Sequence, residues 1–251
     1  MNIGIRRLPL EGLSNCRDLG GFSTAGGGVT NYHAFLRCEV PQRVTDSDLA
    51  YLKAYGLKTS IDFMGDSEIE RHASRLSDVP WVKYIRCPSF NQQVAGERGH
   101  STQKVDTFVN WGDFYIGMLT DCGAWIRNVL ETAAANEGTV MYNCATGKDR
   151  TGLISAMLLG IAGVCEEDII ADYAVSMVYL HRVYQYIVPR FSTVDENGQM
   201  NFEGPFFRTD PGNMGRVLNH IRDNYGSVEK YVFSLGTDPS AVEEIRRRLV
   251  D

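Results

Sequence analysis

The chain has 251 residues, of which 43% are hydrophobic and 22% charged, and its formal net charge is −6. A chain of this length can bury a core without disulfide or metal cross-links, and we expect a single domain over residues 1–251. The acidic balance and the scattered basic residues exclude an extended cationic surface, so nucleic acid is not an expected partner.

The six cysteines are widely separated and none belongs to a Cys-x-x-Cys pair. This spacing does not predict a zinc site, and a chain this long does not require a disulfide framework, so we expect neither metal nor cofactor. The first residues lack the apolar core of a signal peptide, and no run reaches the ~18 apolar residues of a membrane span. We therefore expect a cytoplasmic protein without integral membrane association; secretion is the alternative if a leader has been removed.

The first informative segment contains Asn15, Arg17 and Asp18, followed by the glycine pair Gly20-Gly21. From its residue types alone this segment is a polar turn in which Arg17 and Asp18 form an ion pair. The glycines permit backbone angles that other residues avoid.

Residues 34–38 are predicted as a short strand, and a helix is predicted from Thr45, in the N-cap position, to about Gly56. Residues 58–64 form the next predicted strand, with Asp62 near its carboxyl end. Ligands of open α/β sheets bind beyond the carboxyl ends of the strands, so we expect Asp62 to face a site.

Asp66 and Glu68 follow this strand closely enough to face the same site, although for Asp66 we favour capping of the next helix. Residues 81–87 are predicted as a further strand. Over about 89–111 the periodicity gives way to a long polar loop, which is either functional or a plain surface excursion.

The second half of the chain is predicted to be mainly helical around one strand. Apolar spacing predicts a helix pair over 114–136, a strand over 139–142, a helix over 153–161 and a helix from 166 to about 188. A second polar loop is expected at about 192–213 and a helical C-terminal part at about 210–251. The order of elements predicts an α/β fold: a central, mostly parallel sheet flanked by helices, with a helical C-terminal extension.

The segment from Tyr142 to Gly152 carries the strongest chemical signal. It connects an apolar strand to an apolar helix and brings backbone N–H groups to a helix N-terminus, a geometry that binds anions. Cys144 and Arg150 are separated by five residues. They can therefore reach the same bound phosphate, where the thiolate attacks phosphorus and the guanidinium binds two oxygens. We predict phosphoryl transfer to Cys144.

The Cys-x5-Arg-Thr pattern from Cys144 to Thr151 resembles the signature of the protein tyrosine phosphatase superfamily. The run Gly147 to Gly152 narrows the resemblance to bacterial tyrosine and phosphoinositide phosphatases, and Asn15 to Gly21 resembles a motif near the start of that family. The resemblance implies the cysteine phosphatase fold and a phosphorylated protein or phosphoinositide as substrate. It also implies that Arg17 and Asp18 pack beside the phosphate loop and support it.

These features define the candidate site residues. Cys144 is the expected nucleophile, Arg150 the bidentate phosphate ligand, and Thr151 a hydrogen-bond partner of the thiolate or of the attacking water. The expected backbone cradle consists of Ala145, Thr146, Gly147 and Lys148. The resemblance implies Asp149 as the proton donor, and Asp62 is the second candidate, because the chain contains no Trp-Pro-Asp sequence.

Two positions depart from the family pattern. Asn143 stands where His is usual, and Met64 stands where an arginine is expected. An amide can hold the loop by hydrogen bonds but cannot carry a charge, so we expect a more alkaline activity optimum than in a relative with His. The apolar Met64 side chain cannot make the salt bridge or substrate contact that the expected arginine would make.

The leading hypothesis is a metal-independent phosphatase with a phosphocysteine intermediate, acting on phosphotyrosine and extending to phosphoserine, phosphothreonine or phosphoinositides. The alternative is a catalytically weak phosphate-binding module, a pseudophosphatase marked by Asn143. Sulfur transfer or arsenate reduction by a single cysteine explains Arg150 less well. The sequence leaves open the choice between protein, lipid and inositol phosphate substrates, as well as the oligomeric state.

Overall fold

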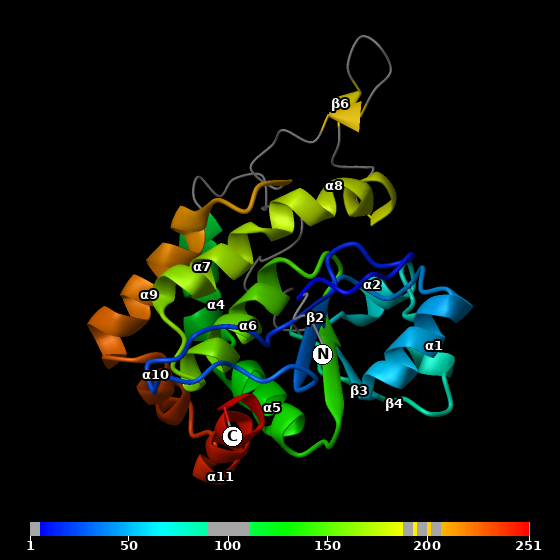
Figure 1. The fold of residues 1–251 in the computed structure, drawn as a ribbon. Helices are drawn as coiled ribbons and strands as arrows, with labels where there is room; N and C mark the ends of the chain where they lie inside the picture. The colour runs from blue at the N-terminus through cyan, green and yellow to red at the C-terminus, as the bar shows by residue number, and fades with distance from the viewer. Residues whose placement is uncertain (1–5, 90–110, 188–192, 195–199, 202–206, 251) are drawn as a thin grey trace.

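A five-stranded sheet lies at the centre of the molecule (Figure 1). The structure, a computed structural model, describes residues 6–89, 111–187, 193–194, 200–201 and 207–250. The strands of the sheet are β1 (Arg17–Asp18), β2 (Phe35–Cys38), β3 (Leu57–Asp62), β4 (Lys83–Arg86) and β5 (Thr139–Asn143). Their order is β1-β2-β5-β3-β4; β1 is antiparallel to β2, and all other neighbours are parallel. The predicted α/β fold with a mostly parallel sheet is confirmed.

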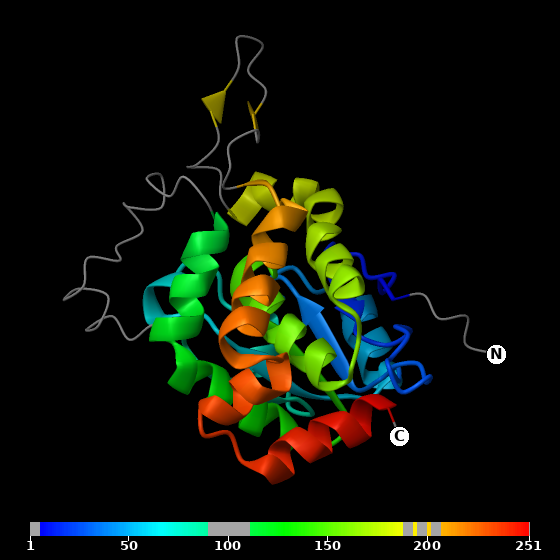
Figure 2. The same cartoon turned by 90° about the vertical axis from the view of Figure 1, so that its left-hand side faces the viewer.

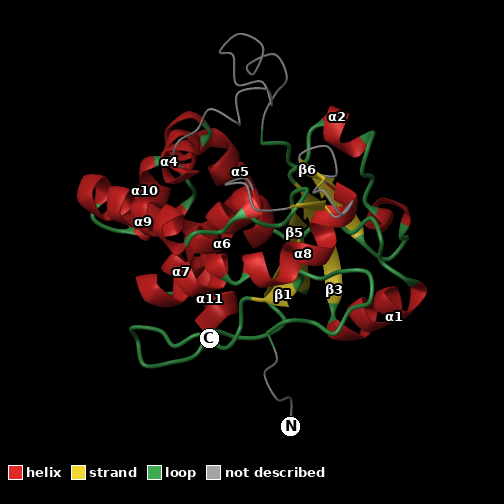
Figure 3. Ribbon diagram, turned by 90° about the horizontal axis from the view of Figure 1, so that it is seen from above, coloured by secondary structure: helices red, strands yellow, loops and turns green. Residues whose placement is uncertain are grey.

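Helices cover both faces of this sheet. They are α1 (Asp46–Tyr55), α2 (Asp66–Ile69), the 3-10 helix η1 (Arg75–Asp78), α4 (Trp111–Asp121), α5 (Gly123–Ala134), α6 (Asp149–Ile161), α7 (Glu166–Ala174), α8 (Ser176–Ile187), α9 (Pro211–Tyr225), α10 (Val228–Ser234) and α11 (Pro239–Val250). Figures 1 and 3 show α1 on one side of the sheet and α5, α6 and α7 on the other. A separate antiparallel pair consists of β6 (Thr193–Val194) and β7 (Met200–Asn201). Across the described ranges no helix has the length and apolar character needed to cross a membrane.

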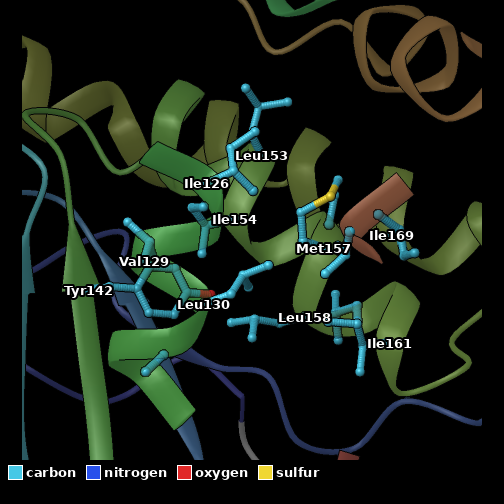
Figure 4. Close-up of a cluster of buried hydrophobic side chains, with 14 of the residues drawn as sticks. Ile126, Val129, Leu130, Tyr142, Leu153, Ile154, Met157, Leu158, Ile161 and Ile169 are labelled. Carbon is cyan, nitrogen blue, oxygen red and sulfur yellow. The ribbon is translucent and has the colours of Figure 1, made fainter. Parts of the chain in front are cut away.

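Alternating side chains along β5 divide the core between the two faces. Val140 and Tyr142 belong to the larger apolar cluster, with α5 and α6, whereas Met141 belongs to the smaller cluster under α1. Figure 4 shows Tyr142 in the larger cluster together with Leu130 and Ile154. Burying one such side chain stabilises the fold by about 1.5–3 kcal/mol. Both clusters therefore fix the strand that leads into the predicted phosphate loop.

The predicted helical C-terminal extension is confirmed as α9, α10 and α11 (Figure 2). Asp210 caps α9 by accepting from the N–H two residues ahead at 2.7 Å, and Ser227 caps α10 by accepting from the N–H three residues ahead at 3.1 Å. Tyr231 of α10 is buried, and its hydroxyl donates to the Leu119 carbonyl of α4 at 2.8 Å. The extension thus packs on the helical layer of the sheet.

The segment expected to be a polar turn instead forms β1. Arg17 pairs with Arg37, and Asp18 pairs with Leu36, in an antiparallel ladder. On its other side the Asp18 N–H donates to the Arg6 carbonyl at 2.8 Å. The prediction of a turn is wrong at these two residues because neighbouring chain segments supply hydrogen bonds that outweigh the local turn preference of Asn, Asp and Gly.

Two helices, α7 and α8, replace the single helix predicted from 166 to about 188. Thr209 explains the break, because its hydroxyl accepts from the Met177 N–H at 2.9 Å and donates to the Ala174 carbonyl at 2.8 Å. The side chain thus takes the place of helical backbone bonds at the junction. The first predicted polar loop, at about 89–111, lies almost wholly outside the described residues. The described part of the second, at about 192–213, contains β6, β7 and the start of α9.

Candidate active site

The β5–α6 loop (residues 144–148) lies at the carboxyl edge of the sheet. Asn143, at the end of β5, is in register with Cys38 of β2 on one side and with Asp62 of β3 on the other. The loop runs directly into α6, which begins at Asp149. The site is therefore bordered by three strand ends and by the positive end of a helix dipole.

The ends of this loop are fixed by close backbone contacts. Cys144 is 1% exposed, and its N–H donates to Oγ1 of Thr151 at 3.0 Å. Gly147 has a φ of 68°, and a Cβ at this position would lie 2.3 Å from the Cys38 carbonyl oxygen. Only glycine fits there, because both the backbone angle and the space exclude a side chain.

Asn15 and Arg37 hold the loop from behind. The Asn15 amide donates to the carbonyls of Thr146 and Gly147 at 3.1 and 3.2 Å, and Arg37 donates to the Gly147 carbonyl at 2.9 Å. In a trans peptide the C=O and N–H point in opposite directions. The N–H groups of Gly147 and Lys148 therefore face away from Asn15, as in a backbone nest that binds anions.

Asp172 of α7 fixes both arginines behind the loop. Its carboxylate accepts from Arg17 Nε at 2.8 Å and from Arg37 Nη1 at 2.5 Å. Burial opposes the charge on Asp172, but the two guanidinium groups lower its pKa to about 2. Arg17 also donates to Oδ1 of Asn15 at 2.6 Å. Arg17 therefore supports the loop through Asn15, and it pairs with Asp172 rather than with Asp18.

Arg150 lies in the first turn of α6, where Glu68 of α2 holds its guanidinium. Nη1 donates to Glu68 Oε2 at 2.8 Å and Nη2 to Oε1 at 2.6 Å, which is a bidentate pair. Burial opposes both charges, yet the pairing lowers the pKa of Glu68 to about 2 and raises that of Arg150. After Glu68, Cys144 and Asp149 also raise the Arg150 pKa. The guanidinium thus lies within electrostatic reach of the thiol.

Two acidic residues expected near the site have other partners. Asp66 pairs with Arg86 at 2.6 Å and is exposed. Asp18 accepts from the His33 N–H at 2.9 Å and from the Tyr55 hydroxyl at 2.7 Å, at the amino ends of β2 and β3. Burial raises the pKa of Asp18, although both donors oppose this shift. The structure therefore does not place Asp18 beside the loop.

Asp149 and Lys148 lie against aromatic residues at the start of α6. The Asp149 carboxylate accepts from the Tyr115 hydroxyl, which is 2.9 Å from that of Tyr173. Burial and the charge of Asp149 raise the Tyr115 pKa, so this hydroxyl remains a donor. Lys148 is buried, with Nζ 3.5 Å from Asp149 and 5.1 Å from the ring centroid of Trp111. The Asp149 side chain keeps 18% exposure, so it is both oriented and accessible.

Asp62 and Asn143 are neighbours at the strand ends. Asp62 accepts from the Met64 N–H at 2.9 Å and from the Tyr84 hydroxyl at 2.7 Å. Burial raises the Asp62 pKa, and the bonds from Tyr84 and Met64 and the nearby Asn143 amide partly offset this shift. The Asn143 amide favours the charged form of Asp62, but in the described part of the chain neither of its polar atoms has a hydrogen-bond partner of good geometry. A buried neutral amide thus occupies the position where His is usual.

The second departure, Met64, produces an apolar cluster. Met64 is fully buried and packs with Val40 and with Leu180, Val183, Tyr184 and Phe207. Ala145 of the β5–α6 loop packs against the same cluster. Apolar contacts therefore hold α8 over the carboxyl edge of the sheet, where a charged residue was expected.

The sequence did not single out Arg37 or Asp172. Both carried a usable signal, because Arg37 interrupts an apolar strand and a buried charge requires a partner. The pairing of Arg37 with Asp172 could not be predicted from the sequence, since it joins β2 to a helix more than 100 residues later. Among the residues that the structure describes, no group of three or more His, Cys, Asp or Glu side chains is arranged to hold a metal ion.

A sequence profile described as the tyrosine phosphatase family matches residues 8–251. The chain belongs to this family. It is 29% identical to a tyrosine-protein phosphatase of Nostoc commune, over 86% of this chain and 74% of that protein. It is 25% identical to the triple specificity protein phosphatase PtpB of Mycobacterium tuberculosis, over 97% of this chain and 98% of that protein. The crystal structure of P. aeruginosa TpbA aligns with a TM-score of 0.40 and 16% identity, over 81% of this chain and 86% of that chain.

Family membership confirms the expected enzyme class. This tyrosine phosphatase is a phosphoric monoester hydrolase, and its substrate carries a phosphoryl group.

Proposed function

We propose that this tyrosine phosphatase works through a phosphocysteine on Cys144. The thiolate attacks phosphorus, the P–O ester bond breaks, and water then cleaves the S–P bond to release phosphate. The observation that carries the proposal is that Asn15 holds the carbonyls of Thr146 and Gly147, which turns the N–H groups of Gly147 and Lys148 to the opposite side of the loop. Arg150 and the N-terminus of α6 balance the charge on the phosphoryl oxygens, and Thr151 binds the backbone at Cys144.

Asp149 donates the proton to the leaving oxygen. Its carboxylate is partly accessible, and Tyr115 and Lys148 orient it at the start of α6. Asp62 is the second candidate, and its raised pKa suits a proton store. However, both of its oxygens are engaged, by the Met64 N–H and by Tyr84, so Asp149 is favoured.

Phosphotyrosine is the first substrate class, in line with the family. The relative in Mycobacterium tuberculosis is named a triple specificity phosphatase, which supports a range that includes phosphoserine and phosphothreonine. The proposed substrates include phosphoinositides, because the Gly-Lys-Asp-Arg-Thr-Gly run resembles that of bacterial tyrosine and phosphoinositide phosphatases. Lys148 of this run is buried. A reducing compartment such as the cytoplasm would keep the nucleophilic thiol available.

A second candidate function is a phosphate-binding module with little turnover. The buried Asn143 amide supports it, because no charged side chain at this position favours the thiolate. The cradle would remain intact in such a protein.

The test is detection of the intermediate. The enzyme is mixed with a phosphotyrosine peptide, a phosphoserine peptide or a phosphoinositide in excess chelator, and the reaction is stopped within milliseconds by denaturation. We expect a phosphoryl group on the peptide that contains Cys144, located by mass spectrometry, and competition by vanadate. Tight vanadate binding without any phosphoenzyme or turnover on all three substrates would favour the binding module.

Replacing the proton donor should change the dependence on the leaving group. We expect Asp149→Asn to lower kcat by about 100-fold on a phosphotyrosine peptide and by much less on p-nitrophenyl phosphate, whose leaving group needs little protonation. Asp62→Asn is the matched comparison and should lower the melting temperature while changing kcat by less than about threefold. The opposite pattern would assign the proton transfer to Asp62.

A further inference from the structure

Glu39 is a buried carboxylate directly behind the β5–α6 loop, and the mechanism above gives it no role. It follows β2 and is fully buried. Oε1 accepts from the Ser14 N–H at 2.5 Å and Oε2 from the Asn15 N–H at 3.0 Å. The loop approaches the Glu39 backbone closely, because a Cβ on Gly147 would lie 2.5 Å from the Glu39 backbone nitrogen.

Asn15 connects Glu39 to the loop. Glu39 holds the backbone N–H of Asn15, while the side chain of Asn15 donates to the carbonyls of Thr146 and Gly147. A displacement of Asn15 would release both carbonyls. The peptide units could then rotate, and their N–H groups would no longer converge on an anion.

We propose that Glu39 is a positioning residue of the β5–α6 loop. Its ionised form holds Asn15 so that the loop N–H groups point at the phosphoryl group, and its protonation releases them. The inference rests on the proposed function, since it takes this loop as the phosphoryl site. Protonation matters because a carboxylate accepts at both oxygens, whereas a carboxylic acid carries a proton on one of them.

The charge on Glu39 is expected to change near neutral pH. Burial raises its pKa to about 7, although the N–H groups of Ser14 and Asn15 and the charge of Arg17 act in the opposite direction. Order in the loop should therefore increase as the pH rises through about 7.

Two charged or ionisable neighbours have pKa values outside this range. On β2, burial raises the pKa of the Cys38 thiol well above its ordinary value. On α7, Asp172 has a pKa of about 2, because Arg17 and Arg37 outweigh its burial. Of these three groups, Glu39 is the one whose charge changes near neutral pH.

The effect on stability has the opposite sign. The folded chain binds the Glu39 proton more tightly than the unfolded chain, where the pKa is the ordinary 4.5. The contribution of Glu39 to stability is therefore full below pH 4.5 and falls as the pH rises to about 7. Loop order and fold stability thus change in opposite directions with pH, which separates positioning from a general folding effect.

Sulfate binding provides the test, because sulfate keeps its charge over the neutral range. We expect wild type to bind sulfate about tenfold more tightly above the transition than below it, the effect of a charge-assisted hydrogen bond. Glu39→Gln should bind about tenfold more weakly than wild type at the alkaline end, without a pH step, and its kcat on a phosphotyrosine peptide should fall by a similar factor. Glu39→Asp keeps the carboxylate and should keep the step.

Asp48→Asn is the matched control. Asp48 accepts from the N–H groups of Glu11 and Gly12, each at 2.8 Å, and so anchors the preceding part of the same segment. This variant should lower the melting temperature and leave the pH step in sulfate binding unchanged. Loss of the step in Asp48→Asn would assign it to general loosening of the segment and overturn the proposal.

Two other results would overturn the proposal. One is that Glu39→Gln keeps the wild-type pH step in sulfate binding. The other is that Glu39→Gln binds sulfate more tightly than wild type at alkaline pH, which would show that Glu39 acts only as a nearby negative charge. If Glu39→Gln does not fold, wild type and Glu39→Asp provide the test. Both should show the pH step in sulfate binding, and its absence from either would contradict the proposal. Sulfate binding with the expected step, but without hydrolysis that depends on Cys144, would refute the proposed function alone.

Discussion

Cys144→Ser is expected to lower kcat on every phosphomonoester by at least about 1000-fold, or about 4 kcal/mol in activation free energy. A serine hydroxyl has the size and position to replace the thiol but is almost completely protonated at neutral pH, so the nucleophile is lost. Because the nest and Arg150 remain, vanadate and sulfate should still bind. Steady-state kinetics together with calorimetric binding checks both parts of this prediction.

Cys165→Ser is the control for loss of a thiol. Cys165 is exposed at the N-terminus of α7, away from the β5–α6 loop in sequence and outside the contacts described for the site. Its replacement should leave kcat unchanged. Retention of a tenth or more of the wild-type kcat in Cys144→Ser would show that another group attacks phosphorus.

Arg150→Lys is expected to lower kcat/KM by about 100-fold even though the positive charge is kept. The lysine ammonium cannot make two parallel bonds to Glu68 and at the same time offer further N–H groups to the phosphoryl oxygens, as a guanidinium with five N–H donors can. Glu68→Gln should lower kcat/KM by about tenfold, because Arg150 keeps its charge but loses the partner that orients it. Kinetics of both variants on one phosphotyrosine peptide give the comparison.

The double variant tests whether the two residues act together. In the Arg150→Lys background, Glu68→Gln should have little further effect, so the two free-energy changes should not add. Asp66→Asn is the matched control on the same helix, since Asp66 pairs with Arg86 instead, and it should be neutral for activity. Additive losses would mean that Glu68 acts independently of Arg150.

Local residue patterns were sufficient for most of the architecture. The apolar run at 139–142, the Thr45 cap and the Asp210-Pro211 pair are signals within a few residues, and the corresponding elements form as predicted. The break between α7 and α8 could not be predicted in this way. It depends on a hydroxyl that Thr209 brings from a distant part of the chain.

The residues of the candidate site also differ in whether the sequence alone could bring them together. Cys144, Asp149 and Arg150 fall within a single loop and helix turn, so their proximity follows from the sequence spacing alone. Glu68 was expected at the same edge because it follows a strand end, but its bidentate pairing required the structure.

The sequence by itself determined the strand–loop–helix connection and the family, and it placed the proposed nucleophile and its arginine in one loop, because such a connection is local and its chemistry lies in consecutive residues. Only the tertiary structure decided what holds this loop. Asn15 and Arg17 lie before and in β1, Glu39 follows β2, and Asp172 belongs to α7, so they meet behind the loop only when the sheet forms. It also separated Arg17 from Asp18. Alternate side chains of a strand point to opposite faces of the sheet, so Arg17 faces α7 and Asp18 faces Tyr55 of α1.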